Sequence, residues 1–256
     1  MIKSSVAFSY AGKRSVDFGI YNITIQSGLY EEPFLASRDI REVETRWSMK
    51  PYFQNISLKP LVFDLSFAIL DYWDDKKIRE IARWLAQDNY QPLFFEEDID
   101  RIFYCVPIDD INIIHNGLKQ GYITLTFRCD APWSYTRQYV TPEYDFSDNP
   151  NGVLLSFANE GDLYLYPEMW ITKVGNGDVS IINQTNGGVE FKFTGLVDGE
   201  IVYVDNENQY IATSLTDTYR YDNFNNNYLE LVVGVNNLWV TGNCKLQFRY
   251  RFKRLQ

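Results

Sequence analysis

Few residues could carry out nucleophilic chemistry, because the chain has one histidine, His115, and three cysteines, Cys105, Cys129 and Cys244. A Cys/His pair works as a nucleophile only when the imidazole lies beside the thiol and a third group orients it. No activating carboxylate motif accompanies His115, which stands directly before an Asn-Gly turn signal. The pattern favours a turn residue over a catalytic base. The odd cysteine count without a CxxC motif favours buried free thiols over a disulfide framework or a zinc site.

Carboxylates are more abundant, with 34 Asp and Glu residues in the chain. Glycoside hydrolysis needs two of them about 5 to 10 Å apart across a sugar-binding cleft. The densest groups are residues 96–100 and the pair Asp109 and Asp110, and neither has the D-x-D-x-D-G spacing of a calcium-binding loop. Acidic loop tips also keep strand edges from aggregating, which is the interpretation we favour. We therefore expect no enzyme activity, no catalytic residue, no metal ligand and no cofactor.

Aromatic side chains offer a different chemistry, since they can stack against sugar rings. The candidates are Trp170, Trp239, Tyr164, Tyr166 and Tyr210. Aromatic residues in a β-sandwich are more often part of the core, and Trp170 and Trp239 lie inside strand patterns that predict burial. A carbohydrate-binding β-sandwich that contacts a host cell surface is kept as the alternative function.

The composition limits the class of protein. The chain has 256 residues, of which 45% are hydrophobic and 16% aromatic, which suits two mainly β domains with separate cores. The net charge is −10, and no run of Lys and Arg exceeds two residues, so specific nucleic-acid binding is not expected. No signal-peptide pattern and no apolar run near the roughly 18 residues of a membrane span is present. We expect synthesis in a cytoplasm and no membrane association.

The first half of the chain predicts strands around a single helix. Apolar residues recur at every second position from 61 to 69 without a break, which predicts a core strand; they are Leu61, Phe63, Leu65, Phe67 and Ile69. Asp74 can cap a helix whose apolar stripe is Ile78, Ile81, Ala82 and Leu85. Further strands are expected at 6–10, 18–23, 93–95, 102–106 and 123–127, with turns at 11–14, 96–100 and 115–119.

Residues 37–50 do not fit this pattern, because charged side chains would occupy both faces of any strand drawn through them. Such a strand cannot bury a face in its own domain. One interpretation is a mobile surface loop. The other, which we favour, is a protruding hairpin that becomes ordered against a neighbouring subunit.

The pattern of predicted elements changes at residues 130–135, from strands with one helix and many charges to short strands separated by Asn/Gly turns. We predict domains at 1–135 and 152–256, joined by a linker at 136–151 that is polar and without periodicity. The second half combines short strands with Asn/Gly turns, including one at Asn236 and Asn237, which is typical of a β-sandwich. In the last strand, Leu246, Phe248, Tyr250 and Phe252 should face inward, and Arg249, Arg251 and Lys253 should give a basic outer face. The strands are expected at 153–157, 163–166, 168–171, 179–182, 189–193, 200–204, 228–233 and 245–252.

Taken in order, short motifs along nearly the whole chain resemble the distal tail protein (Dit) family of long-tailed, non-contractile bacteriophages. Each motif alone is weak, and their order and spacing carry the resemblance. In the first half they are FSYAGK at 8–13, DFGI at 17–20, QPLFF at 91–95 and APWSY at 131–135. In the second half they are NEG at 159–161, YPEMWI at 166–171, DGEIVYVD at 198–205 and GVNNL at 234–238.

The resemblance implies a mainly β fold. The N-terminal domain would be β-sandwich-like, with one α-helix and a protruding β-hairpin arm, and the C-terminal domain would be a galectin-like β-sandwich. Residues 37–50 would be the arm that reaches the adjacent subunit of a hexameric ring. The candidate oligomerisation residues on this arm are Arg38, Ile40, Arg41, Val43, Arg46 and Trp47.

The resemblance also implies partners and a location. The ring would be a homo-hexamer at the virion tail tip, between the major tail (tube) protein and a tail-associated fibre or baseplate protein. The tape-measure protein is a further candidate partner. The genome would pass through the central channel without sequence-specific contacts, and the protein would be synthesised in the cytoplasm of the bacterial host.

Overall fold

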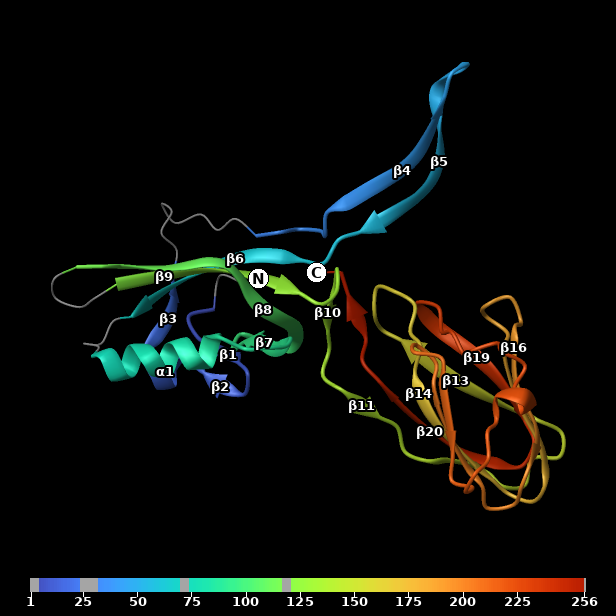
Figure 1. Ribbon diagram of the computed structural model, residues 1–256. Helices are drawn as coiled ribbons and strands as arrows, with labels where there is room; N and C mark the ends of the chain where they lie inside the picture. The colour runs from blue at the N-terminus through green and yellow to red at the C-terminus, as the bar shows by residue number, and fades with distance from the viewer. Residues whose placement is uncertain (1–4, 24–31, 70–73, 117–120, 256) are drawn as a thin grey trace. The chain divides into compact units, whose positions relative to one another are not determined.

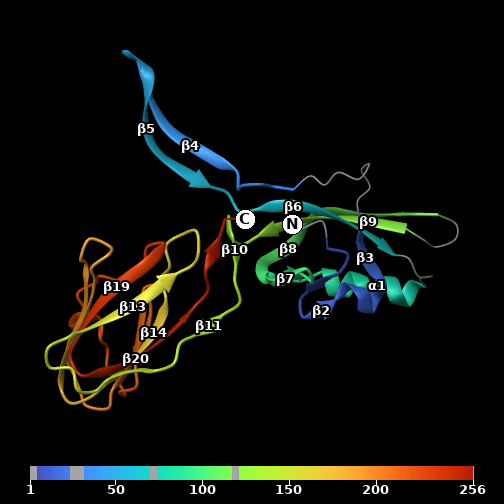
Figure 2. The same ribbon diagram turned by 180° about the vertical axis from the view of Figure 1, so that it is seen from behind.

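The computed structural model describes residues 5–23, 32–69, 74–116 and 121–255 (Figure 1). The chain divides into two compact units, unit 1 with Met1–Tyr135 and Leu255–Gln256, and unit 2 with Thr136–Arg254. Each unit has its own hydrophobic core. Figure 2 shows the ribbon of the two units from behind. Residues 117–119 of one predicted turn and the side chain of Asp110 lie outside the described part. Among the described helices, none is long and apolar enough to span a membrane.

Unit 1 is built on an antiparallel sheet with the order β2-β1-β7-β8-β9-β6-β3, and β10 pairs with β8. A separate two-stranded sheet, β4-β5, belongs to the same unit. The strands are β1 (Phe8–Tyr10), β2 (Lys13–Arg14), β3 (Ile20–Ile23), β4 (Arg38–Thr45), β5 (Ser48–Leu58), β6 (Val62–Ile69), β7 (Gln91–Phe95), β8 (Asp98–His115), β9 (Gly121–Cys129) and β10 (Ser134–Tyr135).

Strand β6 forms where strict alternation predicts it. Phe63, Leu65 and Phe67 are buried, whereas Asp64 lies on the opposite, exposed face. Phe67 stacks on Phe8 of β1 with ring centroids 4.5 Å apart. A strand with one apolar face packs that face against other elements, and here aromatic rings fill the space. The prediction of a core strand in this segment is confirmed.

The single α-helix of the described residues, α1 (Asp75–Leu85), begins as its cap predicts. An Asp74 carboxylate oxygen accepts a hydrogen bond from the Lys77 amide at 2.8 Å. This bond satisfies one of the amides that have no partner in the first turn of a helix. The helix ends at Leu85, before the strand that carries Pro92.

The buried face of α1 differs by one position from the predicted stripe. Ile81, Trp84 and Leu85 are buried, whereas Ala82 is exposed, so the prediction for Ala82 is wrong. The indole of Trp84 explains the difference, because it packs near Phe8 and its Nε1 donates a hydrogen bond to the Tyr10 carbonyl at 2.7 Å. The helix therefore turns its largest aromatic residue toward the sheet.

The first hairpin is shorter than predicted. Strands β1 and β2 pair across a turn at Ala11 and Gly12, both with positive φ, as expected from the sequence. However, residues 18–23 do not complete this hairpin. The 3-10 helix η1 (Ser15–Phe18) and Gly19, with φ of 64°, redirect the chain, so that β3 pairs with β6 instead.

Unit 2 is a β-sandwich. One sheet has the order β11-β20-β14-β17-β18, with β12 also on β20, and the other has the order β13-β19-β15-β16. The apolar residues of both sheets form one core. The elements are β11 (Tyr139–Val140), β12 (Tyr144–Phe146), β13 (Val153–Asn159), β14 (Glu168–Lys173), β15 (Gly177–Asn183), β16 (Glu190–Leu196), β17 (Ile201–Asp205), β18 (Tyr210–Thr213), η2 (Tyr221–Asn223), β19 (Gly234–Thr241), β20 (Cys244–Tyr250) and β21 (Lys253–Arg254).

Two predicted strands of unit 2 are wrong, and the strands β18 and β19 were not predicted. Residues 163–166 and 228–233 contribute only the isolated bridge between Leu165 and Leu231, whereas β18 and β19 were missed. The predicted turn at Asn236 lies inside β19. This side chain is fully buried, accepts a hydrogen bond from the Val232 amide at 2.9 Å and donates one to the Val232 carbonyl at 2.8 Å. A buried asparagine that completes backbone hydrogen bonds has the same sequence signature as a turn.

Residues 136–151 are not the free connector that their lack of periodicity suggests. They contain β11 and β12, and both strands pair with β20. Between them the Thr141 amide donates to the Phe248 carbonyl at 2.9 Å. Strands of two or three residues are too short to show alternation, which is why the sequence did not reveal them.

The outer face of the final strand is less basic than predicted. Leu246 and Phe248 face the core as expected, but Arg249 forms an ion pair with Glu168. Lys253 is buried and pairs with Glu207, so its outward placement was wrong. The positive charges are neutralised by acids that lie far away in the sequence.

A buried ion pair in unit 2 joins Glu200, directly before β17, to Arg220, directly before η2. The Glu200 carboxylate accepts hydrogen bonds from Arg220 Nε at 2.7 Å, from Arg220 Nη2 at 2.6 Å and from the Thr213 hydroxyl at 2.6 Å. Burial acts to raise the pKa of the Glu200 carboxyl, but the hydrogen bonds from Arg220 and Thr213 outweigh it, and the pKa is lowered. The charged form is therefore favoured in the folded state.

We expect Arg220→Ala to lower the free energy of unfolding of the protein by about 3–5 kcal/mol, because it leaves a buried carboxylate without its partner. The pKa of Glu200 is lower in the folded state than in the unfolded state, where it is near 4.3. Its contribution to the free energy of unfolding is therefore fully present above pH 4.3 and is lost as the pH falls through the folded-state pKa. Urea unfolding between pH 3 and pH 7 measures both effects.

The control is Lys192→Ala, which removes an exposed pair with Asp178 at 3.6 Å and should cost less than about 1 kcal/mol. Equal losses in the two variants would contradict this prediction.

Candidate functional site

The feature of unit 1 that its own fold leaves unexplained is the hairpin β4-β5. Among the residues that the structure describes, its two strands pair only with each other, and Figure 1 shows them projecting from the β6 side of the unit. Its base is closed by the Lys59 amide, which donates to the Ser37 carbonyl at 2.9 Å, and by a 2.8 Å ion pair from Lys59 Nζ to Asp39. Every residue of β4 is exposed. The hairpin is a two-stranded ribbon with solvent on both faces.

A β-bulge determines which side chains share a face of this ribbon. Ile40 lies opposite Ile56 and Arg38 opposite Leu58, but after the bulge Glu42 lies opposite Phe53. Residues directly opposite each other point to the same side of a pair of strands. With the extra residue in β5, Phe53 joins the side of Ile40 and Ile56. We call Ile40, Phe53, Ile56 and Leu58 the apolar face of the hairpin.

This apolar face is open to solvent. Ile40 and Phe53 are each 61% exposed, and Ile56 is 46% exposed. An isolated two-stranded hairpin is marginally stable in water, and contiguous exposed apolar side chains mark interaction surfaces. The unpaired edges of β4 and β5 can also add a strand from another chain. The hairpin therefore has the chemistry of a protein–protein contact.

The six candidate residues predicted from the sequence all lie on this hairpin. Arg38, Ile40, Arg41 and Val43 are on β4, and Arg46 and Trp47 form its turn. The register places Arg38 and Ile40 on the side of the apolar face and Arg41 and Val43 on the other side. Their role in oligomerisation stays a prediction.

The second strand of the hairpin was missed by the sequence analysis. The predicted arm ends at residue 50, but β5 continues to Leu58 and carries three of the four residues of the apolar face. The apolar residues at 53, 56 and 58 do not follow period two, because the bulge shifts the alternation by one position. A search for alternating apolar residues that permits one extra residue in the strand could have found β5.

The residues with nucleophilic potential do not form a site. Cys105 and Cys129 lie opposite each other on β8 and β9, both fully buried, and burial raises the pKa of the Cys105 thiol well above its usual range. Burial also raises the pKa of Cys244 to about 12. His115 is the last residue of β8, ten positions from Cys105, a separation on the order of 30 Å along a strand. The imidazole is too distant to activate either thiol.

The acidic groups lie where the sequence suggested, around a loop tip. Glu96 and Glu97 form the turn between β7 and β8, and Glu96 pairs with Arg14 at 2.5 Å. Asp109 has a φ of 64° and lies at the irregular stretch of β8. Over the residues that the structure describes, no group of three or more His, Cys, Asp or Glu side chains could hold a metal ion.

The two tryptophans considered for sugar stacking are outside the core, contrary to the prediction. Alternation along β14 places Met169 and Ile171 inside and leaves Trp170 half-buried on the outer face. However, the guanidinium of Arg249 lies 4.9 Å from the centroid of the Trp170 ring. A Cβ added at Gly152 would lie 2.7 Å from the ring of Trp239, so that ring is also covered.

The three tyrosines differ in how far they are engaged. Tyr164 is 50% and Tyr210 is 53% exposed. The Tyr166 hydroxyl donates to a Glu230 carboxylate oxygen at 2.9 Å, and burial together with this bond raises its pKa to about 12. Of the five candidate positions, the two indoles are covered, whereas the rings of Tyr164 and Tyr210 stay half exposed.

Comparison with known proteins places the chain in a family. Residues 3–131 match the family described as "Phage tail protein N-terminal domain", and residues 133–250 match "Phage tail C-terminal domain". The SPbeta prophage-derived uncharacterized protein YomH of Bacillus subtilis (strain 168) is 32% identical over 255 residues, which covers 100% of both chains.

Two solved structures share the fold over nearly the whole chain. The Dit protein (gp 19.1) of phage SPP1, described as a paradigm of the hub adsorption apparatus in phages that infect Gram-positive bacteria, gives a TM-score of 0.71 at 14% identity, covering 96% of this chain and 98% of that chain. A chain of the phage P2 baseplate gives a TM-score of 0.51 at 8% identity, with coverage of 96% and 98%. The predicted mainly β fold and the resemblance to distal tail proteins are confirmed. The chain is a structural protein of a phage tail, and it belongs to the phage tail protein family that these N-terminal and C-terminal domains define.

Proposed function

We propose that this protein is the distal tail protein of a long, non-contractile phage tail and forms a hexameric ring at the tail tip. The ring connects the tail tube to the host-adsorption apparatus and leaves a channel for DNA. The observation that carries the proposal is the hairpin β4-β5, whose apolar face is solvent-exposed and lies on a ribbon that pairs with no other strand. The hub role described for SPP1 Dit supports it through the shared fold.

A ring follows from the kind of contact that such a hairpin makes. When a projecting element of one subunit meets a different surface on the next, the interface is heterologous, and heterologous contacts close into rings when the rotation allows. A symmetric contact between two hairpins would instead stop at a dimer. The number six comes from the resemblance to distal tail proteins.

The remaining partners fit a structural role. One face of the ring joins the major tail protein, the other face joins the tail-associated fibre or baseplate protein, and the tape-measure protein is a further partner. The net charge of −10 disfavours tight binding of the genome, which suits a channel through which DNA slides. The protein works without catalysis or a cofactor, at the tail tip of the virion, after synthesis in the host cytoplasm.

The mass of the particle in solution tests the role of the hairpin. Residues 38–58 are replaced by a Gly-Ser-Gly loop, which the 2.9 Å hydrogen bond between Ser37 and Lys59 makes sterically simple. We expect the full chain to form a particle of six times its 30.0 kDa mass and the shortened chain to be monomeric, by light scattering over a concentration series. The core of unit 1 does not include the hairpin, so the shortened chain should keep its fold by circular dichroism.

Two results would contradict the proposal. A ring that persists in the shortened chain would show that the hairpin is not the contact. A full chain that stays monomeric at every concentration would show that self-association is not its property.

A point substitution separates assembly from folding. We expect Phe53→Ser to change the free energy of unfolding of the monomer by no more than about 0.5 kcal/mol, because the side chain touches no core, but to abolish the ring. Leu65→Ala, a fully buried position, should instead cost about 2–5 kcal/mol. Denaturant unfolding and light scattering measure the two properties.

The matched control is Asn55→Ser, on the side of the ribbon away from the apolar face. It should leave both the ring and the stability unchanged. Equal loss of the ring in the Asn55 and Phe53 variants would show that the apolar face has no special part in assembly.

A further inference from the structure

We propose that Trp47, at the tip of the hairpin of one subunit, occupies the pocket between α1 and the β1-β2 hairpin of a second copy of the chain. This inference rests on the proposed function and goes further, because it names the surface that receives the hairpin. The tip and the pocket belong to different parts of unit 1, so the contact is heterologous.

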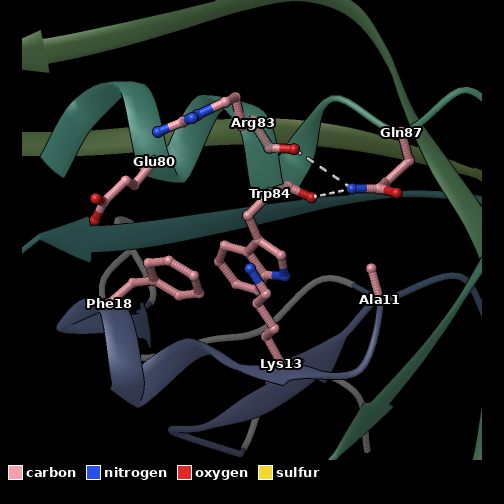
Figure 3. A pocket seen from close by; sticks show the side chains of 7 residues that line it. All are labelled: Ala11, Lys13, Phe18, Glu80, Arg83, Trp84 and Gln87. Atoms are coloured by element: carbon pink, nitrogen blue, oxygen red, sulfur yellow. Dashed lines mark hydrogen bonds between the residues drawn. The ribbon is translucent and has the colours of Figure 1, made fainter. Parts of the chain in front are cut away.

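The pocket has a volume of about 440 Å³. That size falls within the roughly 300–1,000 Å³ range typical of ligand pockets. Figure 3 shows Phe18 and Trp84 side by side between the helix and the β1-β2 hairpin, with Glu80 and Arg83 on the helix above them. The lining residues are Ala11, Lys13, Phe18, Glu80, Arg83, Trp84 and Gln87.

The aromatic floor of the pocket is already formed in the monomer. The rings of Phe18 and Trp84 stack with centroids 4.5 Å apart and an interplanar angle of 13°. Trp84 is held in place by its hydrogen bond to the Tyr10 carbonyl at 2.7 Å. Trp84 is only 3% exposed, so it holds the half-buried ring of Phe18 from behind, and an occupant meets the fixed ring of Phe18, which lowers the entropy cost of binding.

The rim of the pocket carries cations. Lys13 Nζ lies 5.7 Å from the centroid of the Phe18 ring, and Arg83 is exposed on α1. Within the described ranges neither cation is paired with an acid in a salt bridge. Cations beside an apolar floor attract the face of an aromatic ring, and tryptophan is the strongest such partner. Glu80 on the same rim disfavours a simple anion.

The hairpin tip presents a matching group. Trp47 is 96% exposed, and it forms with Arg46 a two-residue turn closed by the pair Thr45 and Ser48. Neither Arg46 nor Trp47 has a positive φ, so the turn lacks the Gly, Asn or Asp chemistry that stabilises tight hairpin turns. Turn formation does not account for a tryptophan here, whereas tryptophan is enriched among the residues that dominate interface energy.

The charges beside Trp47 complement the rim. Arg46 directly precedes Trp47 and Glu44 lies two residues before Arg46, one base and one acid, and the rim presents the cations Lys13 and Arg83 with the acid Glu80. An indole seated on the floor can therefore bring each of these charges near one of opposite sign. Such pairing at the edge of an interface determines orientation more than affinity.

The pocket that receives Trp47 belongs to another copy. Figures 1 and 2 both show the β4-β5 hairpin and α1 on opposite sides of β6 within unit 1. The tip of a hairpin that leaves on one side cannot enter a pocket on the other side of the same sheet. Repeating the contact from copy to copy gives the head-to-tail arrangement that a ring requires.

Photo-crosslinking tests the proposal directly. The full chain carries a benzoyl-phenylalanine at position 47, and crosslinked peptides are identified by mass spectrometry from mixed heavy- and light-isotope copies. We expect crosslinks between copies to peptides that contain residues 11–18 or 80–87. The same probe at Tyr219, which is 84% exposed on unit 2, should not reach these peptides. Crosslinks from position 47 to other segments, or none between copies, would overturn the proposal.

Substitutions at the two ends of the contact provide a second test. We expect Trp47→Ala and Arg83→Glu each to weaken self-association by roughly tenfold or more, and the double variant to lose less than the product of the two effects. The matched control is Arg79→Glu, the same charge change on α1 outside the pocket lining; like Arg83, Arg79 donates through Nε to a helix carbonyl. Equal effects of the Arg79 and Arg83 variants, or fully independent effects of Trp47 and Arg83, would overturn the proposal.

The outcomes separate this inference from the proposed function. If loss of the hairpin abolishes the ring while Trp47→Ala leaves it intact, the pocket assignment is wrong and the role of the hairpin stands. If loss of the hairpin leaves the ring intact, both are wrong.

Discussion

One constraint governs the exposed surface of unit 1, because a two-stranded ribbon cannot bury either of its faces without another layer. A sheet needs a second layer to cover its apolar side, and β4 and β5 have none within their own unit. The chain nevertheless places Ile40, Phe53 and Ile56 together on one side of this ribbon, with a bulge that aligns them. Such a surface gains stability when another molecule covers it, which is the physical basis of the role in assembly that we propose for the hairpin.

The core of unit 1 supports this link. The aromatic cluster of Phe8, Phe67 and Trp84 holds α1 against the sheet, and the same Trp84 is the floor of the pocket beside the β1-β2 hairpin. A rigid floor requires that its residues be fixed by packing from behind, which the stacked rings and the bond to Tyr10 provide. Core packing thereby fixes the pocket that the proposed contact uses.

The sequence predicted those elements whose physics is local. Strand β6 followed from strict alternation and α1 from the Asp74 cap, because each pattern is written in consecutive residues. The failures have other causes. Strand β5 was hidden by a bulge, β19 by an asparagine whose amide completes buried backbone bonds, and β11 and β12 by their shortness. The bulge in β5 is a local irregularity that strict alternation does not allow for, whereas the pairing of β11 and β12 with β20 depends on residues about a hundred positions away, which no short window of sequence contains.

In unit 2, by contrast, tryptophan rings that point out of the sandwich are covered by other residues of the same unit. The outward ring of Trp170 is covered by Arg249, which is in turn paired with Glu168, and Trp239 lies against the backbone of Gly152. Glu200 and Arg220 are likewise joined inside the sandwich. Unit 2 covers its outward indoles but not all of its aromatic rings, since Tyr164 is 50% and Tyr210 is 53% exposed, whereas unit 1 leaves the apolar face of the hairpin and the pocket beside α1 open. The proposed assembly contact accordingly uses surfaces of unit 1.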